Sequence, residues 1–562
     1  MNDIRRTILW VIFGMSMVLL WDKWQVHNGN KPTFFPDPTQ HVIKTDSKAP
    51  VASQANSSVP SSTVAATGTA AVPVAASAGV PVSAGAAAAP SKDLIQVTTD
   101  VFKLSFDPEG GSLVRAELTK QNDIVNKEIN MVVLDQSKDR LYNAQSGLIG
   151  AVGLPTHKTV MALTTPERAL KDGADTLTLR FEAEGGGAKL AKIYTLRRGA
   201  YDIGVSHEVT NTSATEMTPQ VYVQLIRDGN KPQGESSFYS TFTGPVVYTD
   251  KKKYEKIEFS DIEKNKADFE KLSPSGYIGM VQHYFFSAWL APEGTQHENF
   301  VRKVDTNLYS VGMITPLKTI AAGQTQKLDA KLYVGPQDEK KLEALLPGLE
   351  LVKDYGYFTI LSKPLFWLID KLQSLLGNWG WAIVSVVVLL KIAFYWLNAK
   401  AYQSMGKMKA INPKIMEMRE RLKDKPQEMQ KEMMRIYKEE KVNPMGGCFP
   451  IMIQIPVFIA LYWVLLSSVE FRNAPWILWI KDLSAPDPYF ILPVVMTGTT
   501  LLQTWLNPTP PDPMQAKMMW IMPLMFSFMF FLFPAGLVLY WLVNNVLSIA
   551  QQWVINKRLG VN

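Results

Sequence analysis

One positive charge lies inside a long apolar stretch of this chain. Lys391 is the only charged residue between Gly380 and Leu397, which otherwise consists mainly of Val, Leu, Ile, Trp and Phe. A stretch of this length is able to cross a bilayer, and an ionisable residue within a membrane span marks a candidate functional site. Polar residues continue on the same predicted helical face at Tyr395, Asn398 and Tyr402. The sequence therefore predicts a charged site at membrane depth.

Further polar residues occur at helical spacing in other predicted spans. They are Tyr540, Asn544, Ser548 and Gln551, flanked by Trp541, in the last span, with Gln454 and Gln503 in the third and fourth spans. No span contains an acidic residue that could pair with Lys391. The polar stripes therefore predict a water-filled groove rather than a buried ion pair. The alternative is that Lys391 snorkels, because its stem reaches most of the way to the nearby end of its span.

Apolar residues of the third and fifth spans are the predicted contact surface for a hydrophobic helix. We expect Ile451, Ile455, Phe458 and Met525 to form this surface. The methionines of the fifth span recur at helical spacing, which suits soft, shape-tolerant binding. Ordinary core packing explains the same methionine pattern.

The segment from Asn398 to Gly447 is charged, with twelve basic and seven acidic residues, or a net charge of +5. It predicts two helices, Pro413 to Leu422 and Gln427 to Glu440, paired as a hairpin. The candidate docking residues for a partner are Lys414, Arg419, Arg421, Lys425 and Arg435. A solvated charged loop is the alternative interpretation.

The apolar segments that position these residues predict six transmembrane helices, with both termini and the +5 segment on the cytoplasmic side. The expected parts are an N-terminal anchor (1–24), an Ala/Pro/Ser-rich linker (25–92), a β-sandwich (93–346), and a connector with an interfacial amphipathic helix (347–378). After them come the second span (379–397), the hairpin (398–447), the third to sixth spans (448–555) and a cytoplasmic tail (556–562). A cleaved signal peptide is the alternative for the anchor.

Residues 93 to 346 change to a two-residue period that is typical of β-strands. Leu177, Leu179 and Phe181 alternate with polar residues, and many similar short runs are separated by Gly, Asn and Asp turns. This pattern predicts a large all-β sandwich on the periplasmic side. His207 follows the inward face of its run, so we expect a core histidine there rather than a site.

Composition restricts the chemistry. A single cysteine, Cys448, excludes an internal disulfide framework, and all six histidines precede the membrane half. No phosphate-binding loop, metal-ligand spacing or nucleic-acid motif is present in the sequence. We therefore expect no enzyme, no cofactor, no metal and no direct nucleic-acid specificity.

Several ordered stretches closely resemble the YidC-type membrane protein insertases, in the long form of bacteria with two membranes. They include SKPLFWLIDKLQSLLGNWGWAI, VNPMGGCFPIMIQIPVFIALYW, PWILWIKDLSAPDPYFILPV, DPMQAKMMWIMPLMF and FPAGLVLYWLVNNVLSIAQQ. The resemblance implies a polytopic inner-membrane protein with a periplasmic β-supersandwich and a cytoplasmic helical hairpin. It also implies insertion and folding of nascent membrane proteins, alone or with the Sec translocon.

By the same resemblance, Lys391 is the basic residue of a groove open to cytoplasm and lipid, and its aromatic partner on the last span is Trp541, next to Tyr540. The hairpin and the C-terminus are expected to engage the ribosome and the signal-recognition machinery. The family pattern usually has arginine at position 391, and lysine keeps the charge but loses the planar five-donor fork. The competing functions are a small-solute channel or transporter with a periplasmic carbohydrate-binding domain and, more weakly, a sugar epimerase.

Overall fold

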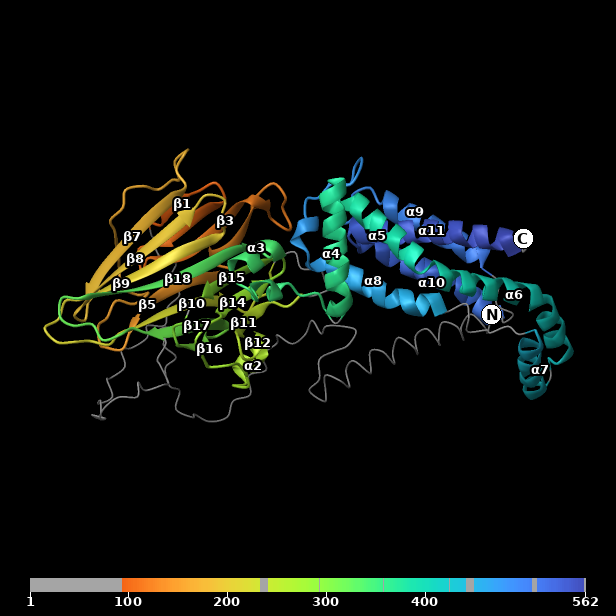
Figure 1. The fold of residues 1–562 in the computed structure, drawn as a ribbon, viewed down its shortest axis with the longest axis horizontal. Coiled ribbons are helices and arrows are strands. Elements are labelled where there is room, and N and C mark those ends of the chain that lie inside the picture. Colours follow the sequence, from red (N-terminus) through yellow and green to blue (C-terminus); the bar gives the residue numbers. More distant parts are fainter. Residues whose placement is uncertain are drawn as a thin grey trace.

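The computed structural model describes residues 93–232, 241–292, 294–356, 358–423, 425–440, 449–507 and 513–559. The predicted anchor, the predicted linker, Cys448 and the last three residues of the chain lie outside these ranges. The described residues form a β part and a helical part at opposite ends of an elongated molecule, as Figure 1 shows.

The β part consists of two nine-stranded antiparallel sheets. One sheet has the order β1 (Ile95–Thr98), β2 (Phe102–Asp107), β3 (Ser112–Asn122), β4 (Asn130–Gln136), β5 (Leu141–Ile149), β10 (Gln220–Asp228), β17 (Leu308–Pro316), β16 (His297–Asp305) and β13 (Leu272–Ser273). The other has the order β12 (Lys253–Lys256), β11 (Gly244–Thr249), β14 (Tyr277–Gln282), β15 (Phe285–Leu290), β18 (Thr325–Pro336), β9 (Asp202–Asn211), β8 (Ala188–Arg197), β7 (Thr176–Gly185) and β6 (Ala162–Leu163). The predicted β-sandwich is confirmed.

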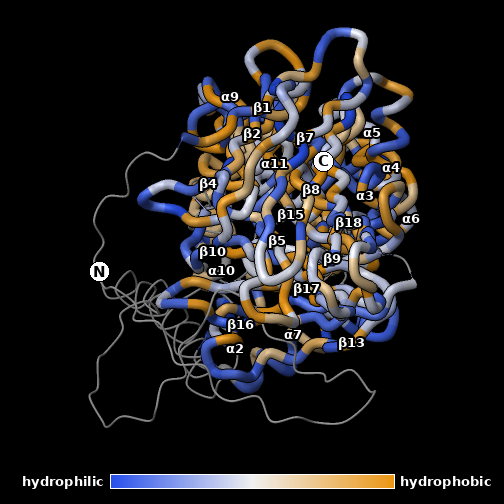
Figure 2. Tube along the Cα trace, turned by 90° about the vertical axis from the view of Figure 1, so that its left-hand side faces the viewer, coloured by the Kyte–Doolittle hydropathy of each residue, from blue (hydrophilic) through white to orange (hydrophobic). Residues whose placement is uncertain are grey.

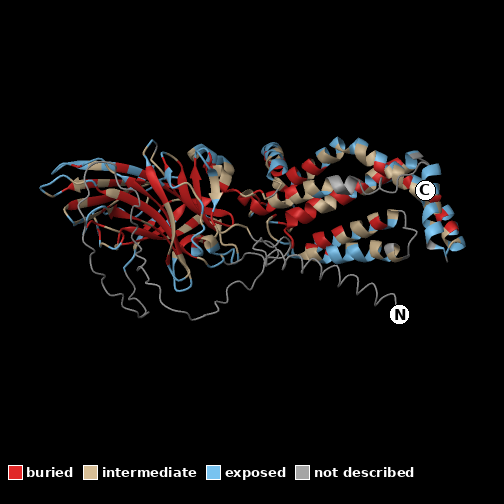
Figure 3. Ribbon diagram, turned by 90° about the horizontal axis from the view of Figure 1, so that it is seen from below, coloured by how far each residue is buried: buried red, intermediate tan, exposed pale blue. Residues whose placement is uncertain are grey.

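Alternation along the strands builds the core between the sheets. Leu177, Leu179 and Phe181 of β7 are buried while their neighbours are exposed or half-buried. Figure 2 shows such changes between hydrophobic and hydrophilic colour along the chain, and Figure 3 shows the buried residues concentrated in the sandwich. Phe106 packs against Phe181 and Tyr194, which joins strands of both sheets. Short helices α2 (Phe259–Glu263) and α3 (Glu339–Leu345) accompany the sheets.

The helical part follows a short 3-10 turn, η1 (Leu349–Val352). Its elements are α4 (Thr359–Leu376), α5 (Trp379–Ala393), α6 (Tyr395–Arg421), α7 (Pro426–Glu439), α8 (Phe449–Ser467), η3 (Val469–Phe471), α9 (Ile491–Leu506), α10 (Pro513–Met529), η4 (Phe530–Leu532) and α11 (Ala535–Leu559). Helix α4 runs across the direction of α5, α8 and α11 (Figure 1). Gly377, in the left-handed conformation, ends α4, and the Asn378 side chain caps α5 by accepting from the Trp381 N–H.

The second predicted span is not one straight helix. Helix α5 ends at Ala393, and α6 starts at Tyr395 at an angle of 67°. Phe394 makes the bend with φ −93° and ψ 10°, and no proline or glycine marks it in the sequence. The prediction of one continuous face through Lys391 and Tyr395 is therefore wrong, because the bend lies between these two residues.

Within the described residues, this bent pair, Trp379–Ala393 with Tyr395–Met408, is the only element with the length and hydropathy of a membrane span. The other apolar helical segments are shorter: Gln454–Ser467, Ile491–Leu506 and Ala516–Leu532. The count of six spans stays a prediction.

One further boundary differs from expectation. Helix α6 continues through Pro413 to Arg421, so the predicted helix start at Pro413 is wrong. Within α4, Asp370 is buried beside Ile369 and pairs with Lys340 at 2.8 Å.

Candidate functional site

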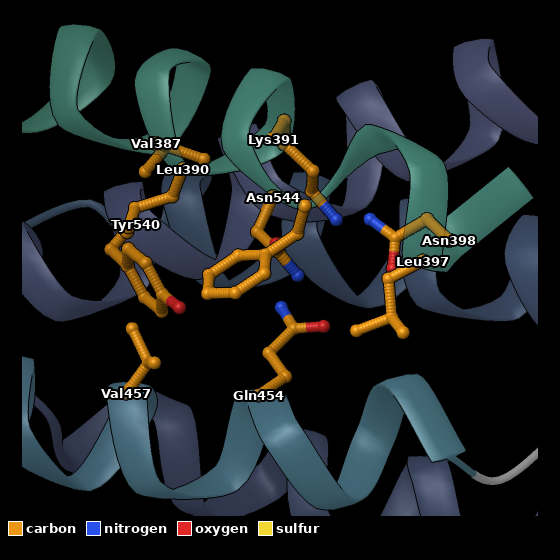
Figure 4. Close-up of a pocket in the computed structure, with 10 residues that line it drawn as sticks. Val387, Leu390, Lys391, Leu397, Asn398, Gln454, Val457, Tyr540 and Asn544 are labelled. Carbon is orange, nitrogen blue, oxygen red and sulfur yellow. The ribbon is translucent and has the colours of Figure 1, made fainter.

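Ten residues of the helical part line one small cavity. They are Val387, Leu390, Lys391, Phe394, Leu397, Asn398, Gln454, Val457, Tyr540 and Asn544. They come from α5, the bend, α6, α8 and α11. Figure 4 shows the polar ends of Lys391, Asn398, Gln454, Tyr540 and Asn544 directed toward one space. The cavity volume of about 40 Å³ has room for about three waters but not for a helix.

Lys391 is half-buried and has a neutral partner. Its Nζ donates to Ser548 Oγ at 2.7 Å, and Ser548 Oγ donates in turn to the Asn544 carbonyl at 2.7 Å. Among the described residues, no carboxylate pairs with this ammonium. The ammonium retains two further protons that it could donate into the cavity.

Two further contacts join α6 to the same turn of α11. Asn398 Nδ2 lies 3.4 Å from Gln551 Oε1, and the Tyr402 hydroxyl lies 3.5 Å from the Ser548 carbonyl. Both are long, weak hydrogen bonds. The two polar stripes expected from the sequence therefore meet across the α5/α6–α11 contact, apart from Tyr395.

Three of the predicted groove residues do not line the cavity. Tyr395 is 43% exposed and lies beyond the bend. Trp541 packs edge-on against Phe458 at 4.8 Å, and Gln503 lies on α9 away from the lining residues. The spacing rule failed for Tyr395 because it assumes an unbroken helix.

The predicted apolar contact residues have different environments. Ile455 on α8 is 50% exposed and Met525 on α10 is 56% exposed, whereas Phe458 packs against Tyr540 and Trp541. The side chain of Ile451 lies outside the described residues. Neighbours of Met525 on α10 are also exposed, among them Phe528 at 75%. Large apolar side chains of α8 and α10 thus face outward.

The predicted docking residues lie on α6, on α7 and between them, and most of them pair with acids. Lys414 pairs with Glu440 at 2.6 Å, Lys425 with Glu428 at 3.2 Å, and Arg435 with Glu432 at 2.6 Å. Arg421 lies 3.9 Å from Glu432, and Arg419 is half-buried on α6. Ile411, Ile415 and Met418 pack against α7 and hold the two helices together. The surface is less positive than its net charge alone suggests.

Sequence reasoning missed a buried ionic cluster between the two parts of the molecule. The Lys353 side chain is fully buried, with Nζ 3.0 Å from both carboxylate oxygens of Glu470 and 3.8 Å from Glu339. The ammonium also lies 3.6 Å from the Phe366 ring centroid. Burial raises the pKa of the Glu470 carboxyl, against the opposing effect of Lys353. No local pattern signals this contact, because Lys353 and Glu470 are 117 residues apart.

His207 is part of the core of the β part. His207 is fully buried and its Nε2 lies 2.9 Å from Ser146 Oγ, as expected for a core histidine. Burial, assisted by the Lys192 charge, lowers the pKa of His207 to about 3. The described residues contain no cluster of His, Cys, Asp or Glu that could hold a metal ion.

Comparisons with known proteins cover nearly the whole chain. The family model for the YidC periplasmic domain matches residues 94–368, and that for the 60Kd inner membrane protein matches residues 371–561. A membrane protein insertase YidC of Cupriavidus pinatubonensis is 54% identical over 99% of this chain and 98% of its own length. The protein of the same name from Bordetella pertussis is 52% identical over the same shares of the two chains.

Among solved structures, an active YidC insertase is similar with a TM-score of 0.39 and 20% identity, covering 82% of this chain and 92% of that one. A galactose mutarotase-like protein from Lactobacillus casei has a TM-score of 0.29 and 12% identity, covering 43% of this chain and 99% of that one. Neither structural likeness is close enough to support an argument about ligands. The full-length identity to curated relatives is sufficient, and the chain belongs to the YidC family of membrane protein insertases.

Proposed function

We propose that this protein inserts and folds nascent proteins into the bacterial inner membrane through the groove around Lys391. The observation that carries this proposal is an ammonium in a small polar cavity whose partner is a neutral hydroxyl. Exposed apolar side chains on α8 and α10 lie on the same part of the molecule. The relatives bear the name membrane protein insertase, which gives no support to a solute channel or transporter.

The groove acts on the polar part of the substrate. A charged side chain at the centre of a bilayer costs about 2.5–3.5 kcal/mol on insertion scales. Lys391, Asn398, Gln454 and Asn544 offer hydrogen-bonding groups along part of that path. An acidic residue of the substrate gains most, because it can accept from the free protons of the Lys391 ammonium.

The apolar part of the substrate moves along the outward side chains. Ile455, Phe458 and Met525 provide a hydrophobic surface from which a helix can pass into lipid, with Ile451 as the expected fourth member. Burial of some twenty apolar residues in lipid supplies the driving force, so the step needs no nucleotide. Trp541 supports this surface by packing on Phe458.

The proposed orientation follows the charge distribution. The +5 segment and both termini lie in the cytoplasm, and the β part lies in the periplasm. The paired helices α6 and α7 then project toward the ribosome and the signal-recognition machinery, with Lys414, Arg419, Arg421, Lys425 and Arg435 as docking residues. The Sec translocon and lipid are the partners within the membrane.

Substitution of Lys391 tests the proposal directly. In cells depleted of the native insertase, Lys391→Glu should abolish insertion of substrates with acidic translocated segments, because it replaces attraction by repulsion. Lys391→Arg should retain insertion, since the charge remains. Wild-type insertion rates in Lys391→Ala for a panel of acidic substrates would contradict the proposal.

Site-directed crosslinking tests the path of the apolar helix. A photoreactive residue at Ile455 should crosslink to stalled nascent chains at the position of their first hydrophobic helix. A probe at Leu375, an 81% exposed residue of α4, is the matched control. Equal crosslinking yields from Ile455 and Leu375 would show that the apolar helix of the substrate has no preferred contact surface on α8.

A further inference from the structure

Ser548 is the described residue that holds the charged end of Lys391. It is 3% exposed on α11, and its Oγ lies 2.7 Å from Lys391 Nζ. The same oxygen donates its proton to the Asn544 carbonyl one turn earlier, also at 2.7 Å. With its proton committed to that carbonyl, the oxygen presents lone pairs to the ammonium.

The serine is itself held in place. Ser548 belongs to the turn of α11 that also contacts Asn398 and Tyr402, so α5, α6 and α11 meet at this point. Its hydroxyl therefore has one well-defined direction. A lysine stem has four rotatable carbons and no such constraint of its own.

We propose that Ser548 is a positioning residue that keeps the Lys391 ammonium inside the groove and prevents it from snorkelling out. This inference rests on the proposed function, because it states how the groove charge is kept at the depth where substrate carboxylates pass. One N–H of the ammonium donates a hydrogen bond to Ser548, and the other two stay directed at the cavity. The serine itself does not contact the substrate.

The inference also links Ser548 to the lysine found here. A lysine ammonium is a compact point charge that needs a partner at one location, whereas an arginine guanidinium has five donors and a longer reach. An arginine at position 391 would reach other acceptors of the same cavity, such as Gln454 and Asn544. The requirement for Ser548 should therefore weaken when residue 391 is arginine.

The first experiment compares insertion of two substrates that differ only in the translocated segment, one acidic and one uncharged. Ser548→Ala should lower insertion of the acidic substrate roughly tenfold, the scale of a lost hydrogen bond to a charged group, and leave the uncharged one within about twofold. Ser548→Thr should retain insertion because it keeps the hydroxyl. Ser467→Ala is the matched control, since Ser467 is buried and makes the same bond to a carbonyl one turn earlier, at 2.7 Å, without contacting Lys391.

The second experiment measures where the ammonium lies. A zero-length carbodiimide crosslink between Lys391 and an aspartate of a stalled acidic nascent chain should form in the wild type and fall at least fivefold in Ser548→Ala. A photocrosslink from Phe458 to the substrate's apolar helix should be unchanged, which separates a displaced charge from a damaged groove. The Lys391→Arg background should reduce the effect of Ser548→Ala on insertion to about twofold.

The outcomes distinguish the two proposals. Absence of the Lys391–aspartate crosslink in the wild type would overturn the groove-charge function itself. A normal wild-type crosslink that is unchanged in Ser548→Ala would leave that function standing and overturn the positioning inference. Equal losses for acidic and uncharged substrates would also overturn it, because they would indicate a general structural defect.

Discussion

Two lysines of this protein are withdrawn from water in different ways. Lys353, between the β part and the helical part, is fully buried and lies between the carboxylates of Glu470 and Glu339. Lys391, in the groove, is half-buried and has one neutral hydroxyl as its partner. A buried charge with complete ionic partners has no capacity left for a ligand, whereas a charge held by a hydroxyl can still attract one.

The two lysines differ more in the chemistry of their partners than in being buried, and this difference is what we expect to separate a structural lysine from a functional one. Lys353 fixes the segment after the β part to the turn between α8 and α9, where Phe471 also packs on Trp379 at the start of α5. Lys391 has no such ionic partner among the described residues, and under the proposed function it is the charge that meets the substrate. We therefore expect the two lysines to respond in opposite ways to removal.

The largest effect on stability should come from Lys353→Met. Removal of one partner leaves the Glu470 carboxylate buried without its cation, which costs about 3–5 kcal/mol. Thermal unfolding of the detergent-purified protein should report this loss. Lys303→Met, which removes an exposed pair with Glu263 at 3.0 Å, should cost under about 1 kcal/mol.

A double variant tests whether the unpaired Glu470 carboxylate causes the stability loss of Lys353→Met. Lys353→Met with Glu470→Leu replaces the pair by apolar groups and should recover most of the stability. If Lys353→Met alone were as stable as the wild type, the cluster would not hold the two parts together, and the contrast with Lys391 would collapse.

Lys391→Ala should show the reverse pattern. Its stability should stay within about 1 kcal/mol of the wild type, because no buried carboxylate is left unpaired. Insertion of acidic substrates should nevertheless fall about tenfold or more. Parallel measurement of unfolding and insertion for both lysine variants tests the distinction, and a large destabilisation by Lys391→Ala would place this lysine among the structural ones.

A third lysine, Lys192 in the β part, is fully buried like Lys353 but has neutral partners like Lys391. We expect it to make the stability of the protein depend on pH. Its Nζ is fully buried and donates to the carbonyls of Gly110 and Ser146, at 2.7 and 2.5 Å. Burial lowers the pKa of Lys192 from 10.5 to about 7. Between about pH 7 and 10.5 the unfolded chain binds this proton and the folded chain does not, so stability falls as pH decreases from about 10 to 7.

The expected slope for Lys192 is about 1 kcal/mol per pH unit, and Lys192→Met should remove it. Denaturant midpoints of the full chain between pH 7.5 and 9.5 provide the measurement. Lys189→Met, on the same strand but 43% exposed and paired with Glu182, should keep the wild-type slope. Identical slopes for wild type and Lys192→Met would show that carbonyl partners keep this lysine charged.

The smallest effects belong to the charged surface of α6 and α7. Lys425→Ala removes an exposed pair with Glu428 and should change stability by less than about 0.5 kcal/mol. Ile415→Ala, at a fully buried position between the helices, should cost about 2–4 kcal/mol of local stability. Hydrogen exchange of α7 distinguishes the two. If Lys425→Ala increased the hydrogen exchange of α7 more than Ile415→Ala does, ion pairs rather than apolar contacts would hold α6 and α7 together.

Short-range sequence patterns predicted the buried faces of the strands and the position of a charged cavity. The alternation of Leu177, Leu179 and Phe181 predicted buried strand faces, and the isolated Lys391 predicted a charged cavity. Strand order could not be predicted, because β5 pairs with β10 across some seventy residues and sequence spacing carries no such information. The same limit applies to Lys353 and Glu470.

Part of the lining of the cavity was visible in the sequence as polar residues at helical spacing. Asn398, Gln454, Tyr540 and Asn544 line the cavity, whereas Tyr395, Gln503 and Trp541 do not. For Tyr395 the reason is the helix break at Phe394, which periodicity could not detect because no proline or glycine marks it. Ser548 was visible as a member of a polar stripe, but its contact with Lys391 depended on how α5 meets α11.

The break at Phe394 has an electrostatic consequence for the groove. It places Lys391 in the last turn of α5, where the aligned peptide dipoles of a helix concentrate about half a negative charge. A cation at this end is stabilised by roughly 0.3–1 kcal/mol, a contribution that an uninterrupted span would not supply at this depth. The backbone thus provides part of the negative potential that a carboxylate would otherwise give. Because peptide groups do not titrate, this contribution is the same at every pH, and it involves no counterion that a substrate would have to displace.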